Sequence, residues 1–542
     1  MKFPQQFKTY QVWLLIIMLS SAIFVESFIP YWYAGQHTPQ GMHFLGQIAY
    51  TLDQNMYFSF TSQARDGHFI LNNKLTGIPN PPVFVNLEFW LAGFIQHISG
   101  ISENAAYQVW RYLGVLLLTT GVYAMAVAVL PTARKVLMAM LLLLFSGGFG
   151  FIFALLDLFH IIGGNTTQLG IIDFRYGLLP FQQMTTNPHF SFPHGLILIA
   201  YACFLLGERR NKIAYYALSG LVFTVIGLVR PYDIIPPVII FPLFILITHR
   251  PFRFDLRLFA IKLLPLLLII PVFLYNVWLF KFNDIFKYWA QQGLNAGSMP
   301  SAIWHYLGFG IAGMLAVVRL SQLRAHPLDK FGKFLLVWFG VTFAFIQLGK
   351  IVPAIGWSPQ IGVYLMVPLA LLGCSIRSVS WSRSIYYTGL AVVVACVALS
   401  NITTVLYFTK NFKGDKTQFY YAQQSEVDAW MWLNDHVAEG AVVLAGNDAS
   451  LHIAKYSKCR VVAAHYSVTP RFQEMSGLVA GIYVSSHLGY EQKPQLQQMN
   501  VDYVYIGPLE KRPKNIRVDS SDYLTPVFAN AAVAIYKVNR TL

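Results

Sequence analysis

Eleven long apolar stretches, separated by short polar segments, follow one another through residues 1–408. Most of them approach the roughly 20 residues that a helix needs to cross the hydrocarbon core of a bilayer. The pattern therefore predicts a membrane α-helical bundle of about eleven transmembrane helices. The predicted spans are 12–30, 108–130, 135–158, 190–207, 213–229, 233–249, 258–280, 303–320, 332–349, 360–376 and 385–408.

The pattern changes in residues 409–542. Short β-type runs alternate there with helix-like runs, which is typical of a small α/β domain. This part contains no G-x-G-x-x-G and no P-loop, so nucleotide binding is not indicated. We expect two domains, a transmembrane module over 1–408 and a C-terminal α/β domain over 409–542. The β-type runs are 441–446, 460–465, 503–507 and 532–538, and the helix-like runs are 426–436 and 494–499.

The composition supports an integral membrane protein. Of the 542 residues, 56% are hydrophobic and 12% are charged, whereas a soluble chain carries roughly 25% charged residues. A soluble enzyme, a disordered chain, a coiled coil and a disulfide scaffold are excluded. The net charge is +15, but the basic excess lies in 1–408, with 25 Lys and Arg against 12 Asp and Glu. It therefore indicates membrane topology rather than a nucleic-acid partner.

The distribution of basic residues predicts the orientation. With a cytoplasmic N-terminus, the inner segments hold sixteen Lys and Arg, and the much longer outer segments hold eight. An odd number of spans then places the C-terminal domain outside the cytoplasm. The first apolar stretch lacks a clear A-x-A cleavage site, so a retained helix is favoured over a signal peptide. We expect a multi-pass protein of a bacterial inner membrane, with a long first outer loop over about 31–107.

Candidate chemical groups lie in this first outer loop. Asp53 stands among apolar and aromatic residues with helical spacing, near Tyr57, and Arg65 and Asp66 follow. A carboxylate in partly apolar surroundings is a plausible general base. An ordinary solvated or helix-capping aspartate is the alternative, which spacing alone favours. Glu26, near the outer end of the first span, is a second acidic candidate.

Further candidates lie at the outer ends of later spans. His189 and His194 enter the fourth span and could bind a phosphate or move protons, or could be interfacial residues without a role. Arg230 could grip a phosphate by paired hydrogen bonds, or could form an ion pair with Asp233 that closes a turn. Lys350 is another candidate partner for an anion. The favoured alternative is that its side chain only extends its ammonium group to the membrane surface, without a binding role.

These groups suit a reaction at the outer membrane surface on a substrate with a phosphate leaving group. A proton pump would need acidic residues in the middle of spans, and those stretches are nearly free of charge. The four cysteines have no metal-site spacing.

The chain resembles the GT-C superfamily of polytopic glycosyltransferases, specifically a bacterial branch that uses sugars linked to polyprenyl phosphate. The retained first helix, the large outer loop with an acidic residue and the outer α/β domain carry this resemblance, together with local strings that extend over nearly the whole chain. The strings are Thr38 to Gly46, Asp53-Gln54-x-x-Tyr57, Gln63 to Gly67, Tyr107 to Arg111, Ser146 to Gly150, Pro188-His189, Arg230 to Asp233 and Tyr503 to Glu510.

The resemblance implies an inverting transfer of a sugar from a polyprenyl phosphate or diphosphate to a glycan, lipid or protein acceptor, in biosynthesis of the cell envelope. It implies that Asp53 is the catalytic base or the metal-binding acid, and that Glu26 and Asp66 are the next candidates for this role. The donor phosphate would meet Arg230, His189, His194, Lys350, Arg65, Tyr57 and Asp233. Members with and without a divalent cation (Mg²⁺, Mn²⁺ or Ca²⁺) exist, so the metal is open.

Two positions depart from the pattern of these relatives. Arg230 stands where they often carry a histidine, and residues 357–360 lack an arginine that they often have. The alternative function is a transporter or flippase of lipid-linked sugars that forms no bond. The lack of an internal repeat argues against it, as do the long first loop and the large outer domain.

Overall fold

The computed structural model describes residues 9–540, apart from 146, 160, 162–178, 249–255, 294–307, 350–351, 353–361, 363, 377–382, 411, 413–418, 486, 512–516 and 519–522. The chain divides into two compact units, each described here by itself. The helical unit comprises Met1–Trp32, Gln108–Tyr275 and Leu294–Lys410, and the mixed unit comprises Tyr33–Tyr107, Asn276–Gly293 and Asn411–Leu542.

Seven helical segments in the described part of the chain are long and apolar enough to cross a membrane. They lie in α1 (Thr9–Gln36), α4 (Glu103–Val129), α10 (Pro188–Arg210), η1 with α12 (Pro231–Thr248), α14 with η2 (Leu264–Phe282), α18 (Lys330–Leu348) and α20 (Arg383–Lys410).

Shorter helices occupy the remaining predicted spans. The multi-pass helical fold is thus confirmed, while the count of eleven spans is not. These helices are α5 (Ala133–Phe145), α6 (Gly150–Leu158), α11 (Ile213–Gly227), α13 (Leu256–Lys262), α17 (Gly310–Ser321) and α19 (Met366–Cys374), and α9 (Pro180–Thr186) precedes α10.

Two predicted spans are interrupted for identifiable reasons. The stretch predicted as 135–158 breaks between α5 and α6 at Gly147, where a Cβ would fall 1.4 Å from the Ser400 hydroxyl, so only glycine fits. The stretch predicted as 258–280 breaks between α13 and α14 just before Pro265, because proline has no N–H to continue the preceding helix.

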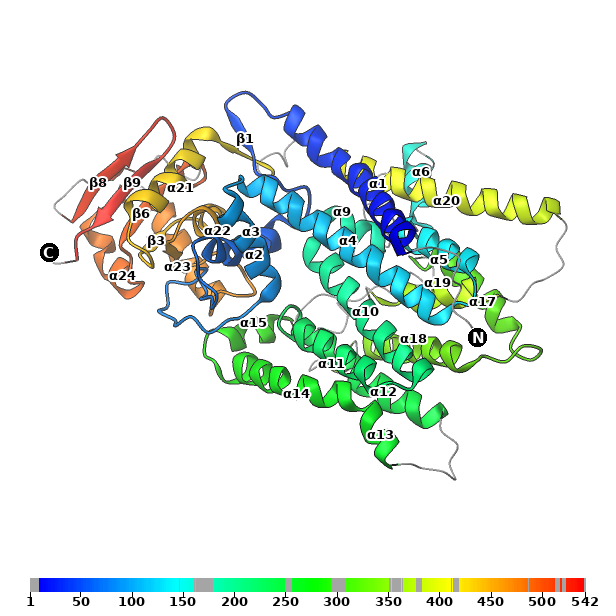
Figure 1. The fold of residues 1–542 in the computed structure, drawn as a ribbon. Coiled ribbons are helices and arrows are strands. Elements are labelled where there is room, and N and C mark those ends of the chain that lie inside the picture. The colour runs from blue at the N-terminus through cyan, green and yellow to red at the C-terminus, as the bar shows by residue number, and fades with distance from the viewer. Residues whose placement is uncertain are drawn as a thin grey trace. The chain divides into compact units, whose positions relative to one another are not determined.

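The core of the helical unit is aromatic. Helix α10 packs against α11, α12 packs against α18, and α17 packs against α19, as can be followed in Figure 1. Phe204 stacks on Phe241 with ring centroids 4.0 Å apart, and Tyr201 lies 4.8 Å from Trp338. All four side chains are buried, so these rings hold α10, α12 and α18 together.

The mixed unit joins the first loop to the C-terminal part of the chain. Strand β1 (Met42–Phe44) pairs antiparallel with β2 (Tyr421–Gln423), with His43 opposite Ala422. Helix α2 (Thr51–Arg65) packs on both α3 (Leu87–Ser99) and α22 (Asn447–Tyr456). The segment α15 (Phe286–Gly293) adds Trp289, which stacks on Phe60 of α2.

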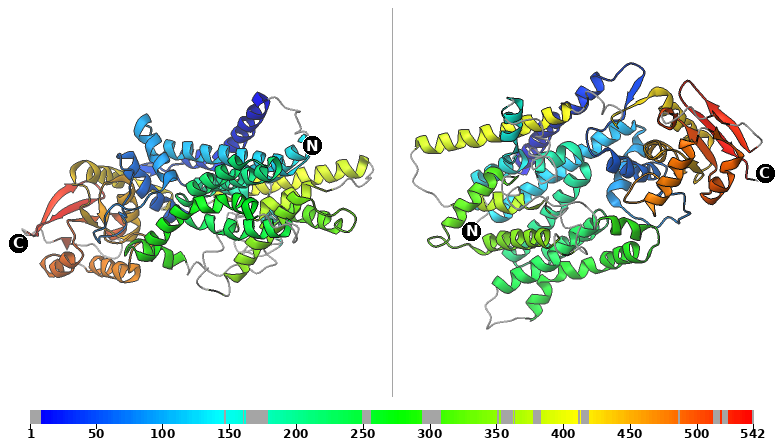
Figure 2. Two further views of the ribbon diagram at one scale, coloured as in Figure 1. Left: turned by 60° about the horizontal axis from the view of Figure 1, so that its bottom comes forward. Right: turned by 180° about the vertical axis from the view of Figure 1, so that it is seen from behind.

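A five-stranded mixed sheet lies within residues 409–542, in the order β4-β3-β6-β9-β8. Strands β4, β3 and β6 are parallel, and β9 is antiparallel to β6 and β8. Figure 2 shows this sheet from two further directions. The predicted α/β character is confirmed. The strands are β3 (Val442–Leu444), β4 (Arg460–Val461), β6 (Tyr503–Ile506), β8 (Leu524–Ala529) and β9 (Ala534–Val538), with the small pair β5 (His487–Leu488) and β7 (Arg517–Val518).

The helices around this sheet include both predicted helical runs. Helix α21 (Gln424–His436) covers the first of them and α24 (Lys493–Gln498) the second. The pattern did not predict α22 or α23 (Phe472–Val484). A short helix α25 (Pro508–Lys511) follows β6.

Candidate functional site

Asp53 lies in the first turn of α2, within the mixed unit. Tyr50, directly before the helix, has a left-handed backbone with φ of 50° that turns the chain into α2. A carboxylate in the first turn of a helix interacts favourably with the helix N-terminus. The Asp53 side chain keeps 40% of its surface exposed, so a solute can reach this carboxylate.

A histidine from the C-terminal part of the chain faces Asp53. His465 Nε2 lies 3.2 Å from Asp53 Oδ1, and the His465 side chain is fully buried. The other ring nitrogen, Nδ1, accepts a hydrogen bond from the Ser467 backbone N–H at 3.2 Å and lies 2.8 Å from Ser467 Oγ. Tyr466 stacks on the imidazole at 4.7 Å, and burial together with the Asp53 carboxylate raises the pKa of Tyr466.

A hydrogen-bond network fixes the turn that carries His465. The Thr469 hydroxyl accepts hydrogen bonds from the backbone N–H groups of Ala464 and His465, and it donates one to the carbonyl of Leu75 at 2.6 Å. Asn73 donates a further bond to this turn at 2.8 Å. Because Leu75 and Asn73 belong to the first loop, the loop and the turn hold each other in place.

Two buried lysines lie between the first loop and the C-terminal part of the chain. Lys74 Nζ donates to Ser62 Oγ and to the Ser457 carbonyl, both at 2.8 Å. Burial, with a smaller effect of a neighbouring arginine, lowers the pKa of Lys74 to about 7. Lys455 Nζ lies 3.8 Å from Glu103, and burial lowers the pKa of Lys455 as well.

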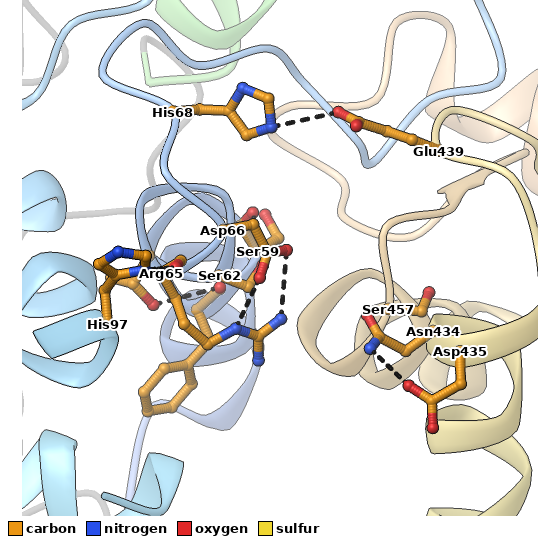
Figure 3. Close-up of polar contacts among 12 residues, drawn as sticks. Ser59, Ser62, Arg65, Asp66, His68, His97, Asn434, Asp435, Glu439 and Ser457 are labelled. Carbon is orange, nitrogen blue, oxygen red and sulfur yellow. Dashed lines mark hydrogen bonds and ion pairs between the residues drawn. The ribbon is translucent and has the colours of Figure 1, made fainter. Parts of the chain in front are cut away.

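The other candidates of the first loop do not gather around Asp53. Arg65 and Asp66 pair with each other at 2.9 Å at the end of α2 (Figure 3). A rise of 1.5 Å per residue separates Arg65 from Asp53 by about 18 Å along the helix axis. Tyr57 is buried and stacks on Phe89 at 5.2 Å.

A second polar cluster lies in the helical unit, around Arg230. The side chains of Arg230 and Asp233 are fully buried, with Nε 3.4 Å from Oδ2. Arg230 also donates to the hydroxyls of Tyr232 at 2.9 Å and Tyr364 at 3.2 Å. Tyr364 donates in turn to Asp233 at 2.5 Å. The guanidinium is thus enclosed by partners, and its charge is balanced by a carboxylate within the same turn.

The two histidines at the start of α10 differ in their surroundings. The backbone N–H of His189 donates to the capping side chain of Asn187 at 3.0 Å. His194 is fully buried, with Nδ1 2.7 Å from Gln183 Oε1 and its ring edge-on to Tyr364 at 4.8 Å. His194 therefore joins the Arg230 cluster through Tyr364.

The last two predicted residues lie elsewhere. Glu26 is in α1, where its side chain is hydrogen-bonded to Asn401 of α20. Lys350 lies outside the described residues. The structure therefore brings Arg230, Asp233 and His194 together in the helical unit, and Asp53 belongs to the mixed unit.

Sequence reasoning does not find three residues that these clusters contain, namely His465, Tyr364 and Gln183. The only local signal for His465 is its place at the end of a β-type run, in Arg460–His465. A residue at the end of a parallel strand is a common position for a functional group in α/β folds. Gln183 and Tyr364 have no distinguishing pattern.

Comparison with solved structures shows the fold. AglB, an oligosaccharyltransferase from Archaeoglobus fulgidus solved with an inhibitory peptide and a dolichol-phosphate, aligns with TM-score 0.55 at 12% identity, over 98% of this chain and 75% of that one. ArnT from Cupriavidus metallidurans bound to undecaprenyl phosphate aligns with TM-score 0.52 at 14% identity, over 98% of both chains. No protein-family model matches the sequence, and no curated protein is similar to it. The chain shares the fold of these two proteins, in agreement with the fold that the sequence resemblance to the GT-C superfamily implied.

The described residues around Asp53 do not by themselves form a site for a divalent cation. AglB has also been solved in complex with Zn and sulfate, and that structure aligns with TM-score 0.51 at 12% identity, over 96% of this chain and 73% of that one. Mg²⁺ and Ca²⁺ prefer several oxygen ligands, and the group next to the Asp53 carboxylate is the imidazole of His465. No group of three His, Cys, Asp or Glu side chains suited to a metal occurs among the described residues.

Proposed function

We propose that this protein is a membrane glycosyltransferase. It would move a sugar from a polyprenyl phosphate or diphosphate to a hydroxyl-bearing glycan, lipid or protein acceptor, on the outer face of a bacterial inner membrane. The fold supports the reaction class, since AglB is an oligosaccharyltransferase by name, and both AglB and ArnT were solved with a polyprenyl-type phosphate. The observation that carries the proposal is the Asp53 carboxylate, which is solvent-accessible and paired with His465.

In the proposed reaction Asp53 accepts the proton of the acceptor hydroxyl. The freed oxygen attacks the anomeric carbon, the bond from that carbon to the phosphate oxygen breaks, and the polyprenyl phosphate leaves with the electron pair. Asp53 then returns its proton to solvent. Attack opposite the leaving group inverts the configuration at the anomeric carbon. General-base assistance of this kind contributes typically 10²–10⁴-fold to a rate.

That Arg230, His189 and His194 bind the leaving phosphate stays a prediction. Preorganised positive charge would stabilise the developing anion there. Arg230 would have to release Asp233 to do so, because both side chains are fully buried against each other. We therefore base the proposed function on Asp53 and test the Arg230 pair separately.

The test compares the envelope glycans and polyprenyl-linked sugars of a deletion strain by mass spectrometry. The strain is complemented with wild type, with Asp53→Asn, or with Asp66→Asn as a matched control at the other end of α2. We expect one glycan linkage to disappear on deletion and its lipid-linked donor to accumulate. Wild type and Asp66→Asn should restore the linkage, and Asp53→Asn should not.

Other outcomes would change the proposal. Restoration by Asp53→Asn at wild-type protein levels would remove Asp53 as the base. Transport of a lipid-linked sugar, the alternative function, requires no new glycosidic bond. Accumulation of the donor on the inner leaflet, with transfer intact in detergent extracts of the deletion strain, would therefore favour a flippase.

A further inference from the structure

We propose that a cavity at the carboxyl ends of β3 and β6, within the mixed unit, binds one sugar unit of a glycan acceptor. The bound unit is one that carries no negative charge. This inference rests on the proposed function and names the class of its acceptor. The position of the cavity in the sheet, its size and the chemistry of its lining carry it.

The order of the strands indicates where this sheet can bind a ligand. In the order β4-β3-β6-β9-β8, the chain leaves β3 toward β4 and leaves β6 toward β8 and β9, on the other side. Ligands of open α/β sheets bind outside the carboxyl ends of the strands at such a point of reversal. Asp448 and Ala449 follow β3, Pro508 and Leu509 follow β6, and all four line the cavity. The cavity therefore lies where the topology of the sheet favours a binding site.

A single carboxylate fixes the two strand ends that border the cavity. Glu510 Oε1 accepts the backbone N–H of Gly446 at 2.9 Å, and Glu510 Oε2 accepts that of Gly507 at 3.0 Å. Gly446 lies between β3 and α22, and Gly507 lies between β6 and α25. Because these bonds hold both ends before a ligand arrives, binding there requires little further ordering of the chain.

The size of the cavity suits one six-membered ring. Its volume is about 110 Å³. A single water needs roughly 10–15 Å³, and a cavity of about 150 Å³ is large enough to hold benzene. The cavity therefore accommodates most of one sugar ring, and it is too small for an extended peptide or a lipid chain.

The polar part of the lining suits hydroxyl groups and does not suit anions. None of the lining residues that the structure describes is a lysine or an arginine, so a phosphate or carboxylate would lack a counter-charge. Asp448 also occupies the first turn of α22, a position that otherwise attracts an anion. Carboxylates accept hydrogen bonds from sugar hydroxyls, and such charge-assisted bonds are about twice as strong as neutral ones. The polar lining residues are Thr51, Asn55, Gln423, Glu426, Asp448 and His452.

One buried atom of the lining lacks a partner. Nδ1 of His452 is buried and has no hydrogen-bond partner among the described residues, although buried polar groups are normally hydrogen-bonded. The imidazole stacks on Trp430 with ring centroids 4.8 Å apart. Burial, with a smaller effect of Lys455, lowers the pKa of His452 to about 3, so the ring is neutral near neutral pH. A hydroxyl both donates and accepts, and it can therefore satisfy Nδ1 in either neutral tautomer.

The first turn of α2 connects the cavity to the candidate base. Thr51 and Leu52 line the cavity, and Asp53 follows them directly in the same turn. Asp53 itself is not among the lining residues. A sugar unit in the cavity would therefore position a neighbouring unit of the same glycan, whose hydroxyl meets Asp53. The acceptor accordingly has at least two sugar units.

The kinetic test mixes the purified full chain with lipid extract of the deletion strain, as the source of donor, and with increasing amounts of glycan released from the envelope of that strain. Leu509→Trp narrows the cavity, and Asp448→Ala removes a carboxylate at an exposed position, where folding should not suffer. We expect each variant to raise the KM for the released glycan roughly 10-fold and to change kcat less than about twofold. Asp435→Ala, at an exposed carboxylate of α21 outside the cavity, should match wild type. A wild-type KM in either cavity variant would overturn the inference.

Two further results separate this inference from the proposed function. An active Asp53→Asn protein would remove Asp53 as the base, while a raised KM in the cavity variants would still support the acceptor site. Transfer of the sugar to a protein or lipid, with none to the released glycan, would overturn the inference and leave the proposed transferase in place.

A second measurement detects binding without turnover. Saturation-transfer difference NMR is recorded for the released glycan with Asp53→Asn protein in nanodiscs. We expect the strongest saturation on the protons of one sugar unit, its loss when Leu509→Trp is added, and its retention when Asp435→Ala is added instead. Equal saturation with and without Leu509→Trp would overturn the inference, as would a saturated unit that carries a carboxylate or a phosphate.

Discussion

Replacement of Lys74 by methionine should remove a large part of the pH dependence of the mixed unit's stability. Lys74 is fully buried, and its ammonium donates to Ser62 Oγ and the Ser457 carbonyl. These two bonds do not offset the loss of hydration, so the pKa of Lys74 falls to about 7. The unfolded chain has a lysine pKa near 10.4. Folding therefore displaces a proton from Lys74 at any pH between these two values.

The sign and the magnitude follow from linkage. Since the unfolded state binds more protons, stability rises with pH between about 7 and 10.4. From pH 7 to pH 9, the shift of Lys74 contributes about 2 kcal/mol of added stability. For a domain of a couple of hundred residues, 1 kcal/mol corresponds to roughly 2–4 °C in melting temperature. The expected gain is thus about 4–8 °C.

The assay is thermal unfolding of the full chain in nanodiscs at pH 7, 8 and 9, with tryptophan fluorescence as the readout. We expect the wild type to gain stability over this range and Lys74→Met to gain about 2 kcal/mol less. Lys458→Met, at a half-buried lysine directly after Ser457, is the control and should keep the wild-type slope. A Lys74→Met protein whose stability rises with pH as steeply as that of wild type would refute the reasoning.

Two further predictions test the packing, one in each unit. The single variants Arg230→Met and Asp233→Leu should each lose about 3–5 kcal/mol of folding stability, because each leaves a buried charge unpaired. The double variant should recover most of this stability, as measured by the melting temperature. Single variants as stable as wild type would contradict the pairing. Gly93→Ala should lower the folding stability by roughly 1–3 kcal/mol, because the added Cβ would lie 2.2 Å from the Thr61 carbonyl oxygen. Gly477→Ala, where a Cβ meets nothing within 4 Å, is the control, and equal melting temperatures for the two would contradict close packing of α2 on α3.

Periodicity in the sequence is enough to place most elements of both units. Apolar length predicts the long helices because a span must satisfy all its backbone groups internally. Short runs of β-type residues predict β3, β6 and β9, of which β3 and β6 are buried along nearly their whole length. The failures occur where a single residue overrides the pattern. Gly147, where the apolar stretch is interrupted, packs closely on Ser400. Hydrophobicity alone does not predict this contact.

The motif Tyr503 to Glu510 illustrates a different limit. Glu510 is buried and accepts hydrogen bonds from the backbone N–H groups of Gly446 and Gly507. Burial raises the pKa of its carboxyl group. Its position in the motif is thus explained by the support it gives to the ends of β3 and β6. A charged residue within a family-like string is equally compatible with catalysis and with such support, and only the contacts distinguish the two.

Of the two residues that meet at the candidate site, Asp53 could be predicted from the sequence and His465 could not, for a related reason. Asp53 is recognisable because its loop stands directly after the first span and because the GT-C resemblance assigns an acid to that loop. His465 is not, since the pairing of β1 with β2 and the bond of Thr469 to Leu75 join segments that no local pattern connects. Helical or strand periods reflect which face of one element is buried, not which distant element covers it. The partner of the predicted base therefore becomes visible only once the first loop and the C-terminal domain fold as one unit.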